Sequence, residues 1–139
     1  MSYATLSDLI ERAGEAEIVQ IADRDRDGAA DADVIAAALA DADNAIDGYL
    51  ATRYDTPLDD VPDLVVTWAV SLARYTLHRN GAPDHVEADY KAAIAALKDA
   101  ARGLIALPLA AGGTVTAGAG GTMGCHPDEV FTADRLRGW

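Results

Sequence analysis

The sequence is poor in cysteine and lysine, and each shortage excludes a class of protein. The single cysteine, Cys125, excludes an internal disulfide. The lysines are Lys91 and Lys98, and 11 basic residues stand against 23 acidic ones, for a net charge of −12. A free-standing DNA-binding domain, or a protein held on an anionic membrane by charge, normally has the opposite balance. We therefore expect no non-specific binding to nucleic acid and no membrane partner.

Long apolar runs are also missing. No segment approaches the roughly 20 apolar residues that are needed to cross a bilayer. The first residues, MSYATLSDLIERAGE, have neither the basic nor the apolar region of a secretory signal peptide. We expect a soluble, intracellular protein.

What the sequence does contain is helical periodicity. Half of the residues are hydrophobic, many of them alanine, and apolar positions recur at three- and four-residue spacing. This pattern predicts an all-α fold: a small helical bundle over residues 1–107, with about three long helices and two short N-terminal ones. The predicted helices are Leu6–Ala13, Glu15–Ala22, Asp33–Tyr54, a segment that begins at Asp60–Asp63 with Pro62 in its first turn, and Asp84–Arg102.

Short signals mark several ends of these helices. Thr5 and Asp8 have the spacing of a capping box, and Gly14 and Gly103 stand where helices would stop. Residues 104–109 alternate loosely and contain Pro108, which favours an extended, strand-like segment over further helix.

An aspartate-rich loop precedes the first long helix. Residues 23–33 read DRDRDGAADAD, which is the D-x-D-x-D-G layout of a calcium loop. Alternate side chains can converge on a hard cation, and Gly28 permits the sharp turn between them. The candidate ligands are Asp23, Asp25, Asp27, the carbonyl of Ala29, and Asp31.

This loop departs from an EF-hand at one position. The twelfth residue would be a bidentate glutamate and is Val34 here, so Asp31 would have to take that role. The alternative is an aspartate-rich turn without a metal, in which Asp31 or Asp33 caps the next helix. If calcium does bind, we expect a structural ion, because no nucleophile or general base lies beside the loop in sequence.

The C-terminal part, residues 108–139, has a different composition. Its first half, AAGGTVTAGAGGTMG, is too rich in glycine for a core and predicts a flexible arm. The chain then ends in a segment with anchor-like residues, which suits docking on a partner protein, although folding back on the bundle is an equal alternative. The candidate docking residues are Val130, Phe131, Leu136, Arg137 and Trp139.

Motifs for catalysis are absent from the sequence. It has no H-E-x-x-H or C-x-x-C zinc spacing, no phosphate-binding glycine motif and no nucleophile elbow. Cys125 and His126 are neighbours, but a lone pair supplies too few ligands for a metal site. We expect a protein that is not an enzyme.

Five segments together resemble one family. In chain order they are YATLSDLIERAGEAEIVQIADRDRDGAAD, DADNAIDGYLATRYDTPL, LARYTLH, ALKDAARG and VFTADRLRGW. The family is the small helical head–tail connector, also termed adaptor or head-completion protein, of Mu-like tailed phages and prophages. The resemblance covers nearly the whole chain, and the glycine-rich stretch is its variable part.

The resemblance implies a structural protein of the virion. Similar connectors form a ring, commonly of about twelve copies, beneath the portal and extend the DNA channel toward the tail. The implied partners are the portal protein, neighbouring copies of the chain, and a downstream tail or stopper protein. Genomic DNA would pass through without specific binding. The implied location is the neck of the particle, and the host cytoplasm during assembly. The alternative function, from the loop alone, is a calcium-binding protein-interaction module.

Overall fold

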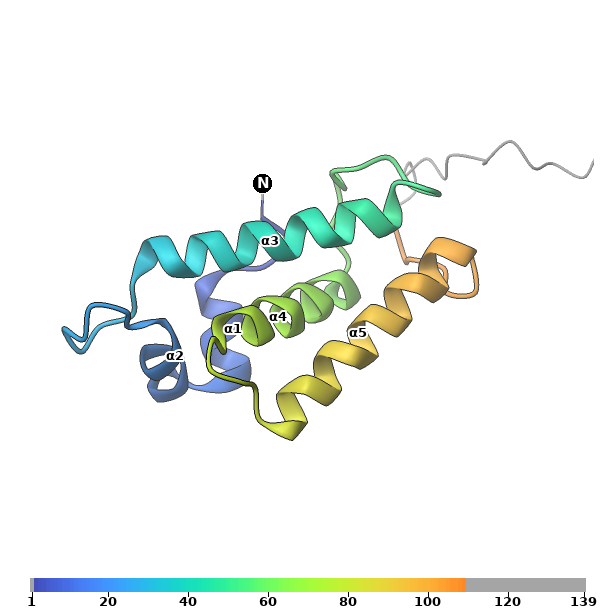
Figure 1. Cartoon of the computed structure of the whole chain (residues 1–139). Coiled ribbons are helices and arrows are strands. Elements are labelled where there is room, and N and C mark those ends of the chain that lie inside the picture. The colour runs from blue at the N-terminus through green and yellow to red at the C-terminus, as the bar shows by residue number, and fades with distance from the viewer. Residues whose placement is uncertain (1, 110–139) are drawn as a thin grey trace, which may run out of the picture.

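The computed structural model describes residues 2–109, and these form an all-α bundle without a β-strand (Figure 1). Two short helices come first, and three long helices make the body of the bundle. In chain order they are α1 (Leu6–Ala13), α2 (Glu15–Ala22), α3 (Ala32–Leu50), α4 (Asp63–Leu77) and α5 (Asp84–Arg102). No helix in this part of the chain is long and apolar enough to span a bilayer.

The two short helices have the predicted boundaries. The Thr5 side chain accepts a hydrogen bond from the backbone N–H of Asp8, and the Asp8 carboxylate accepts one from the backbone N–H of Thr5. This reciprocal capping box fixes the start of α1. Gly14 ends it with a φ of 88°, a conformation that a residue without a Cβ adopts readily. The side chains of Leu9 in α1 and Ile18 in α2 are fully buried in the core.

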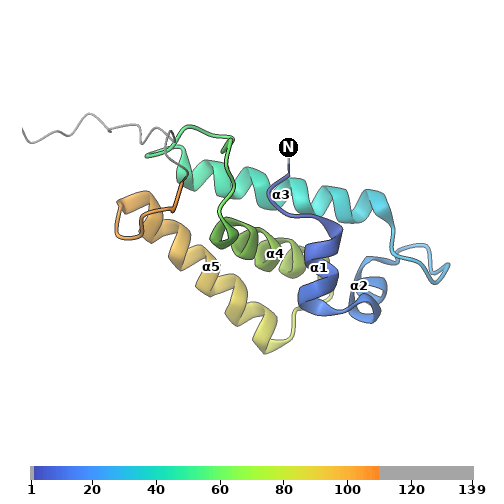
Figure 2. The same ribbon diagram turned by 180° about the vertical axis from the view of Figure 1, so that it is seen from behind.

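Helix α4 is the centre of the bundle. It packs against α3, α5 and α1, and Figure 2 shows it between α3 on one side and α5 on the other. Its buried side chains include Val65, Trp68, Leu72 and Leu77, as its nearly continuous apolar sequence predicts. Pro62 is the N-cap residue of this helix, one residue before the first turn, in which we had predicted it to lie.

Helix α3 ends four residues earlier than predicted. The helix stops at Leu50, and the chain turns over the next residues, so that the prediction of helix as far as Tyr54 is wrong. The reason is tertiary. Tyr54 is 4% exposed, and its hydroxyl accepts a hydrogen bond of 3.2 Å from the backbone N–H of Leu107. This contact requires Tyr54 to leave the helical path and enter the core.

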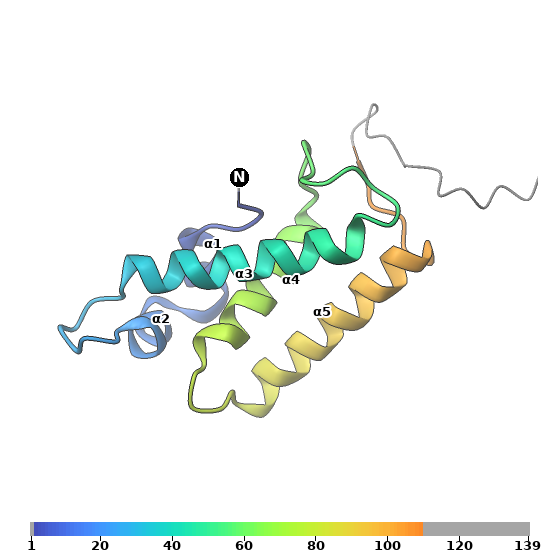
Figure 3. The same cartoon turned by 45° about the horizontal axis from the view of Figure 1, so that its top comes forward.

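The C-terminal ends of α3 and α5 converge, and Figure 3 shows α5 running obliquely to α3. Gly103 ends α5 in the left-handed conformation, with φ 80°, which confirms the predicted stop. The guanidinium of Arg53 lies against Gly103, where an added Cβ would clash with Arg53 Nη1. Residues 104–109 form no further helix, as predicted, and they are not paired in a β-strand. Leu107 of this segment is buried.

The N-terminal segment is tied to the bundle by Tyr3. Its hydroxyl donates a hydrogen bond to Asp47 of α3 and accepts one of 2.9 Å from the backbone N–H of Leu58. Its own backbone N–H donates to Asp43 over 3.0 Å. Burial, together with the hydrogen bond to Asp47, raises the pKa of the Tyr3 phenol. The phenol therefore joins α3 to the connection between α3 and α4.

Candidate functional site

The aspartate loop leaves the bundle between α2 and α3 and is organised around one carboxylate. Asp23 Oδ1 accepts hydrogen bonds from the backbone N–H groups of Arg26 (2.6 Å) and Asp27 (3.2 Å). Its Oδ2 accepts from the N–H of Gly28 over 3.0 Å. Arg26 and Gly28 have positive φ angles of 64° and 90°, so the chain bends sharply twice around this carboxylate. Gly28 thus has the turn role that the sequence predicted.

Three of the predicted ligands are brought together in the loop. Carboxylate oxygens of Asp23, Asp25 and Asp27 lie within 4.8 Å of one another. The backbone N–H of Asp27 acts to lower the pKa of Asp25, but desolvation, the charges of Asp27 and Asp31, and a hydrogen bond with the Asp23 side chain outweigh it and raise the pKa. The oxygen spacing and the carboxylate chemistry fit a hard cation such as calcium, which takes six to eight oxygen ligands in all.

Asp31 lies outside this group of three. Its Oδ2 accepts a hydrogen bond of 2.8 Å from the backbone N–H of Arg24, which closes the loop across its base. Asp31 is also the N-cap residue of α3, but its side chain makes no capping hydrogen bond. Three carboxylates alone would leave a calcium ion short of ligands, so water or backbone carbonyls, such as that of Ala29, would have to complete the shell.

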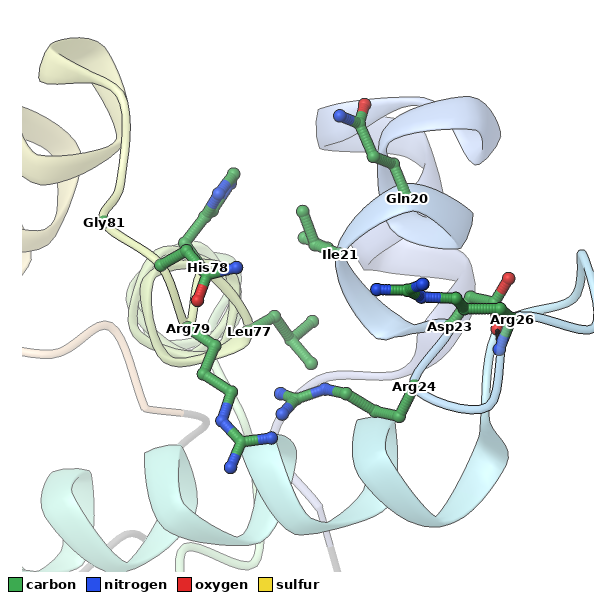
Figure 4. A pocket seen from close by; sticks show the side chains of 10 residues that line it. Gln20, Ile21, Asp23, Arg24, Arg26, Leu77, His78, Arg79 and Gly81 are labelled. Carbon is green, nitrogen blue, oxygen red and sulfur yellow. Dashed lines mark hydrogen bonds between the residues drawn. The ribbon is translucent and has the colours of Figure 1, made fainter.

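A polar pocket of about 440 Å³ lies between this loop and the C-terminal end of α4. Figure 4 shows the guanidinium groups of Arg24 and Arg79 extending into the same space, with Ile21 and Leu77 beside them. Within residues 2–109, the side chains of Arg24, Arg26 and Arg79 make no salt bridge. This pocket was not predicted from the sequence, because Arg24 and Arg26 lie far from Arg79 along the chain.

A family model described as "Bacteriophage Mu, Gp36" matches residues 3–124. The chain belongs to the Bacteriophage Mu Gp36 family. It is 36% identical over 107 residues to the Mu-like prophage FluMu protein gp36 of Haemophilus influenzae, covering 77% of this chain and 76% of that protein. It is 35% identical over 92 residues to gene product J of Escherichia phage Mu, covering 66% of this chain and 65% of the phage protein. The resemblance to a Mu-like phage family is therefore confirmed.

A partly buried ion pair joins α4 to α2 beside the pocket in this Gp36-family chain. Arg74 of α4 is 8% exposed and donates from Nε and Nη2 to the two carboxylate oxygens of Glu17 in α2, each over 2.7 Å. His78 Nε2 lies 3.3 Å from Glu17, and His85 Nε2 lies 3.4 Å from Arg74. The hydrogen bond from Arg74 holds the pKa of Glu17 below its ordinary value.

The other predicted site residues of this Gp36-family chain lie outside the described residues. They are Val130, Phe131, Leu136, Arg137 and Trp139. Cys125 and His126, which were not predicted to form a site, also lie outside the described residues. Docking through the tail therefore stays a prediction.

Proposed function

We propose that the chain is a structural component of a Mu-like phage particle, namely a head–tail connector that forms a ring beneath the portal. The match to the Gp36 family over residues 3–124 is the observation that carries this proposal. Its partners would be the portal protein, other copies of the chain, and a tail or stopper protein below. The chain would serve as a building block of the virion neck, without catalysis.

The surface of α3 supports a role in packing between copies. Its exposed positions include Ala36, Ala37, Ala40 and Gly48, whose small side chains leave the backbone accessible to a neighbour. A ring requires each copy to present two different complementary faces. An alanine-rich helix face can approach a second helix closely, so α3 is the element we assign to this contact.

The net charge supports the passage of DNA. Like charges repel, so a channel wall with an excess of carboxylates would let DNA pass without holding it. The −12 charge of the chain provides that excess. Mapping of a ring on its portal tests this point: acids lining the bore would support it, and basic rings dominating the bore would refute it.

Docking on the portal is tested by removing the end of the tail. We expect the full chain to co-sediment with the portal protein of its own phage. Deletion of residues 130–139 should abolish co-sedimentation while the helical circular dichroism per bundle residue stays the same. A deletion variant that still binds the portal would exclude the tail as the anchor.

A second candidate function, a calcium-responsive interaction module, is favoured by the convergence of Asp23, Asp25 and Asp27. Calorimetric titration with calcium tests it, with Asp25→Asn and Asp27→Asn as the affected variants. Asp33→Asn is the matched control, because Asp33 is an exposed aspartate in the first turn of α3 outside the group. A regulatory ion must also change affinity for the portal protein. If calcium binds without changing that affinity, the ion is structural.

A further inference from the structure

The pocket beside the aspartate loop adjoins a second one, and together they form a groove with two chemical characters. The first pocket is lined by Arg24, Arg26 and Arg79 and carries the unpaired guanidinium groups. The second, of about 220 Å³, shares Arg24 and Leu77 with the first. Its other lining residues are Val34, Ala37, Ala38, Asp41 and Thr76. We call the two pockets together the arginine groove.

The cationic end carries an excess of positive charge on an acidic protein, because three arginines line it against one aspartate, Asp23. Elsewhere in the chain, Arg12 and Arg74 are paired with carboxylates. Arg24, Arg26 and Arg79 have no such partner within residues 2–109, although they share one pocket. Bringing three guanidinium groups together beside a single carboxylate costs free energy, which a bound anion would recover.

The one carboxylate that lines the cationic end is already engaged. Both oxygens of Asp23 accept hydrogen bonds from the loop backbone, at Arg26, Asp27 and Gly28. These bonds hold the carboxylate against its own loop, so its single negative charge offsets only part of the charge of the three arginines. A guanidinium presents paired N–H donors that match the two oxygens of a carboxylate.

The second pocket of the groove determines which kind of side chain can lie next to the bound carboxylate. Val34, Ala37 and Ala38 of α3, with Leu77 of α4, form an apolar wall next to Arg24. Asp41 lies at this end and would repel a second negative charge there. A ligand should therefore place its carboxylate toward Arg24 and Arg79 and an apolar side chain over the alanines.

We propose that the arginine groove binds a protein segment in which a carboxylate stands beside an apolar side chain. Duplex DNA fits the groove less well than a protein segment does, because DNA binding relies on many phosphate contacts along a basic surface. Here the cations are confined to one pocket on an acidic protein. This ligand chemistry holds independently of the connector role.

The probe is a fluorescein-labelled acetyl-Asp-Glu-Val-Phe-amide peptide, whose sequence is that of residues 128–131. Binding is measured by fluorescence anisotropy to the full chain and to a full-length D128N/E129Q variant, in which the chain's own segment has lost the carboxylates that would compete. We expect saturable binding to at least the D128N/E129Q protein. The matching amide peptide, Asn-Gln-Val-Phe, should bind about tenfold more weakly or not at all.

Substitutions locate the binding. In the D128N/E129Q protein, adding R24Q and R79Q should weaken peptide binding about tenfold or more. The matched control adds R102Q, because Arg102 is exposed in the last turn of α5, away from the groove, and should leave the affinity unchanged. Circular dichroism should show the same helix content for all variants, since Arg24 and Arg79 make no side-chain hydrogen bond within residues 2–109.

Three outcomes would overturn the proposal. The first is that the acidic peptide binds neither protein, or binds equally well without Arg24 and Arg79. The second is that inorganic phosphate displaces the labelled peptide at the same concentration as the unlabelled acidic peptide does. The groove would then be a simple anion site. The third is that a 20-base-pair duplex competes through the same arginines more strongly than the peptide does, which would make it a nucleic-acid contact.

Discussion

Arg74 and Glu17 form a bidentate ion pair, with Nε and Nη2 of the arginine each 2.7 Å from a carboxylate oxygen of the glutamate. The pair joins α4, the centre of the bundle, to α2, which leads into the aspartate loop. Both the loop and the arginine groove therefore depend on this contact for their position relative to the long helices.

Loss of the glutamate should destabilise the fold. Glu17→Gln leaves the guanidinium of Arg74 buried without a negative partner. Removing one member of a fully buried pair costs about 3–5 kcal/mol, and the partial exposure of Glu17 reduces this to about 2 kcal/mol. Urea unfolding followed by circular dichroism measures the change. Glu15→Gln, an exposed acid of the same helix, is the control and should stay within about 0.5 kcal/mol of the wild type.

The same pair should make stability depend on pH in acid. The pKa of Glu17 is lower in the folded protein than its ordinary value of 4.5, chiefly because Arg74 donates to its charged form. The stabilisation is therefore present above pH 4.5 and is lost as the pH falls through the folded pKa. The difference in free energy of unfolding between the wild type and Glu17→Gln should shrink below that pH. A difference that stays constant from pH 7 to pH 3 would show that Glu17 does not titrate with folding.

The phenol of Tyr3 should stabilise the bundle through two hydrogen bonds. Tyr3→Phe removes the acceptor of the buried Leu58 N–H and the donor to Asp47, so we expect a loss of about 1–3 kcal/mol. Tyr49→Phe is the matched control, since the Tyr49 hydroxyl has no hydrogen bond within residues 2–109. Equal midpoints of thermal unfolding for the two variants would contradict the assigned role of Tyr3.

Two glycines should respond oppositely to alanine. Gly103 has a φ of 80°, and an added Cβ would press on the Arg53 guanidinium, so Gly103→Ala should destabilise by more than about 1 kcal/mol. Gly48 lies within α3, where an added Cβ meets nothing within 4 Å, so Gly48→Ala should stabilise by up to about 1 kcal/mol. Chemical unfolding of both variants in one denaturant series checks the signs. The same sign for both would contradict the described end of α5.

Local sequence signals were sufficient for much of the fold. The capping box at Thr5, the glycine at position 14 and the stop at Gly103 act within a few residues, and the boundaries of α1, α2 and α5 follow from them. The end of α3 could not be predicted in this way. Tyr54 leaves the helix to meet Leu107, a residue 53 positions away.

The two candidate sites differ in the same way: one follows from local spacing and the other from tertiary packing. The spacing of Asp23, Asp25 and Asp27 is a local pattern, and the structure brings these three together. The arginine groove depends on Arg24 and Arg79, which lie on separate elements and meet only because α2 packs beside the end of α4. Asp31 was also predicted as a ligand from the spacing, but its carboxylate accepts a hydrogen bond from the backbone N–H of Arg24 and lies outside the group of three.

Electron microscopy of the purified chain mixed with the portal protein of its own phage tests the connector role most directly. We expect class averages to show a ring of added density on one face of the portal, coaxial with the channel and absent from images of the portal alone. Portal images that remain unchanged at saturating concentrations of the folded chain would contradict the connector role.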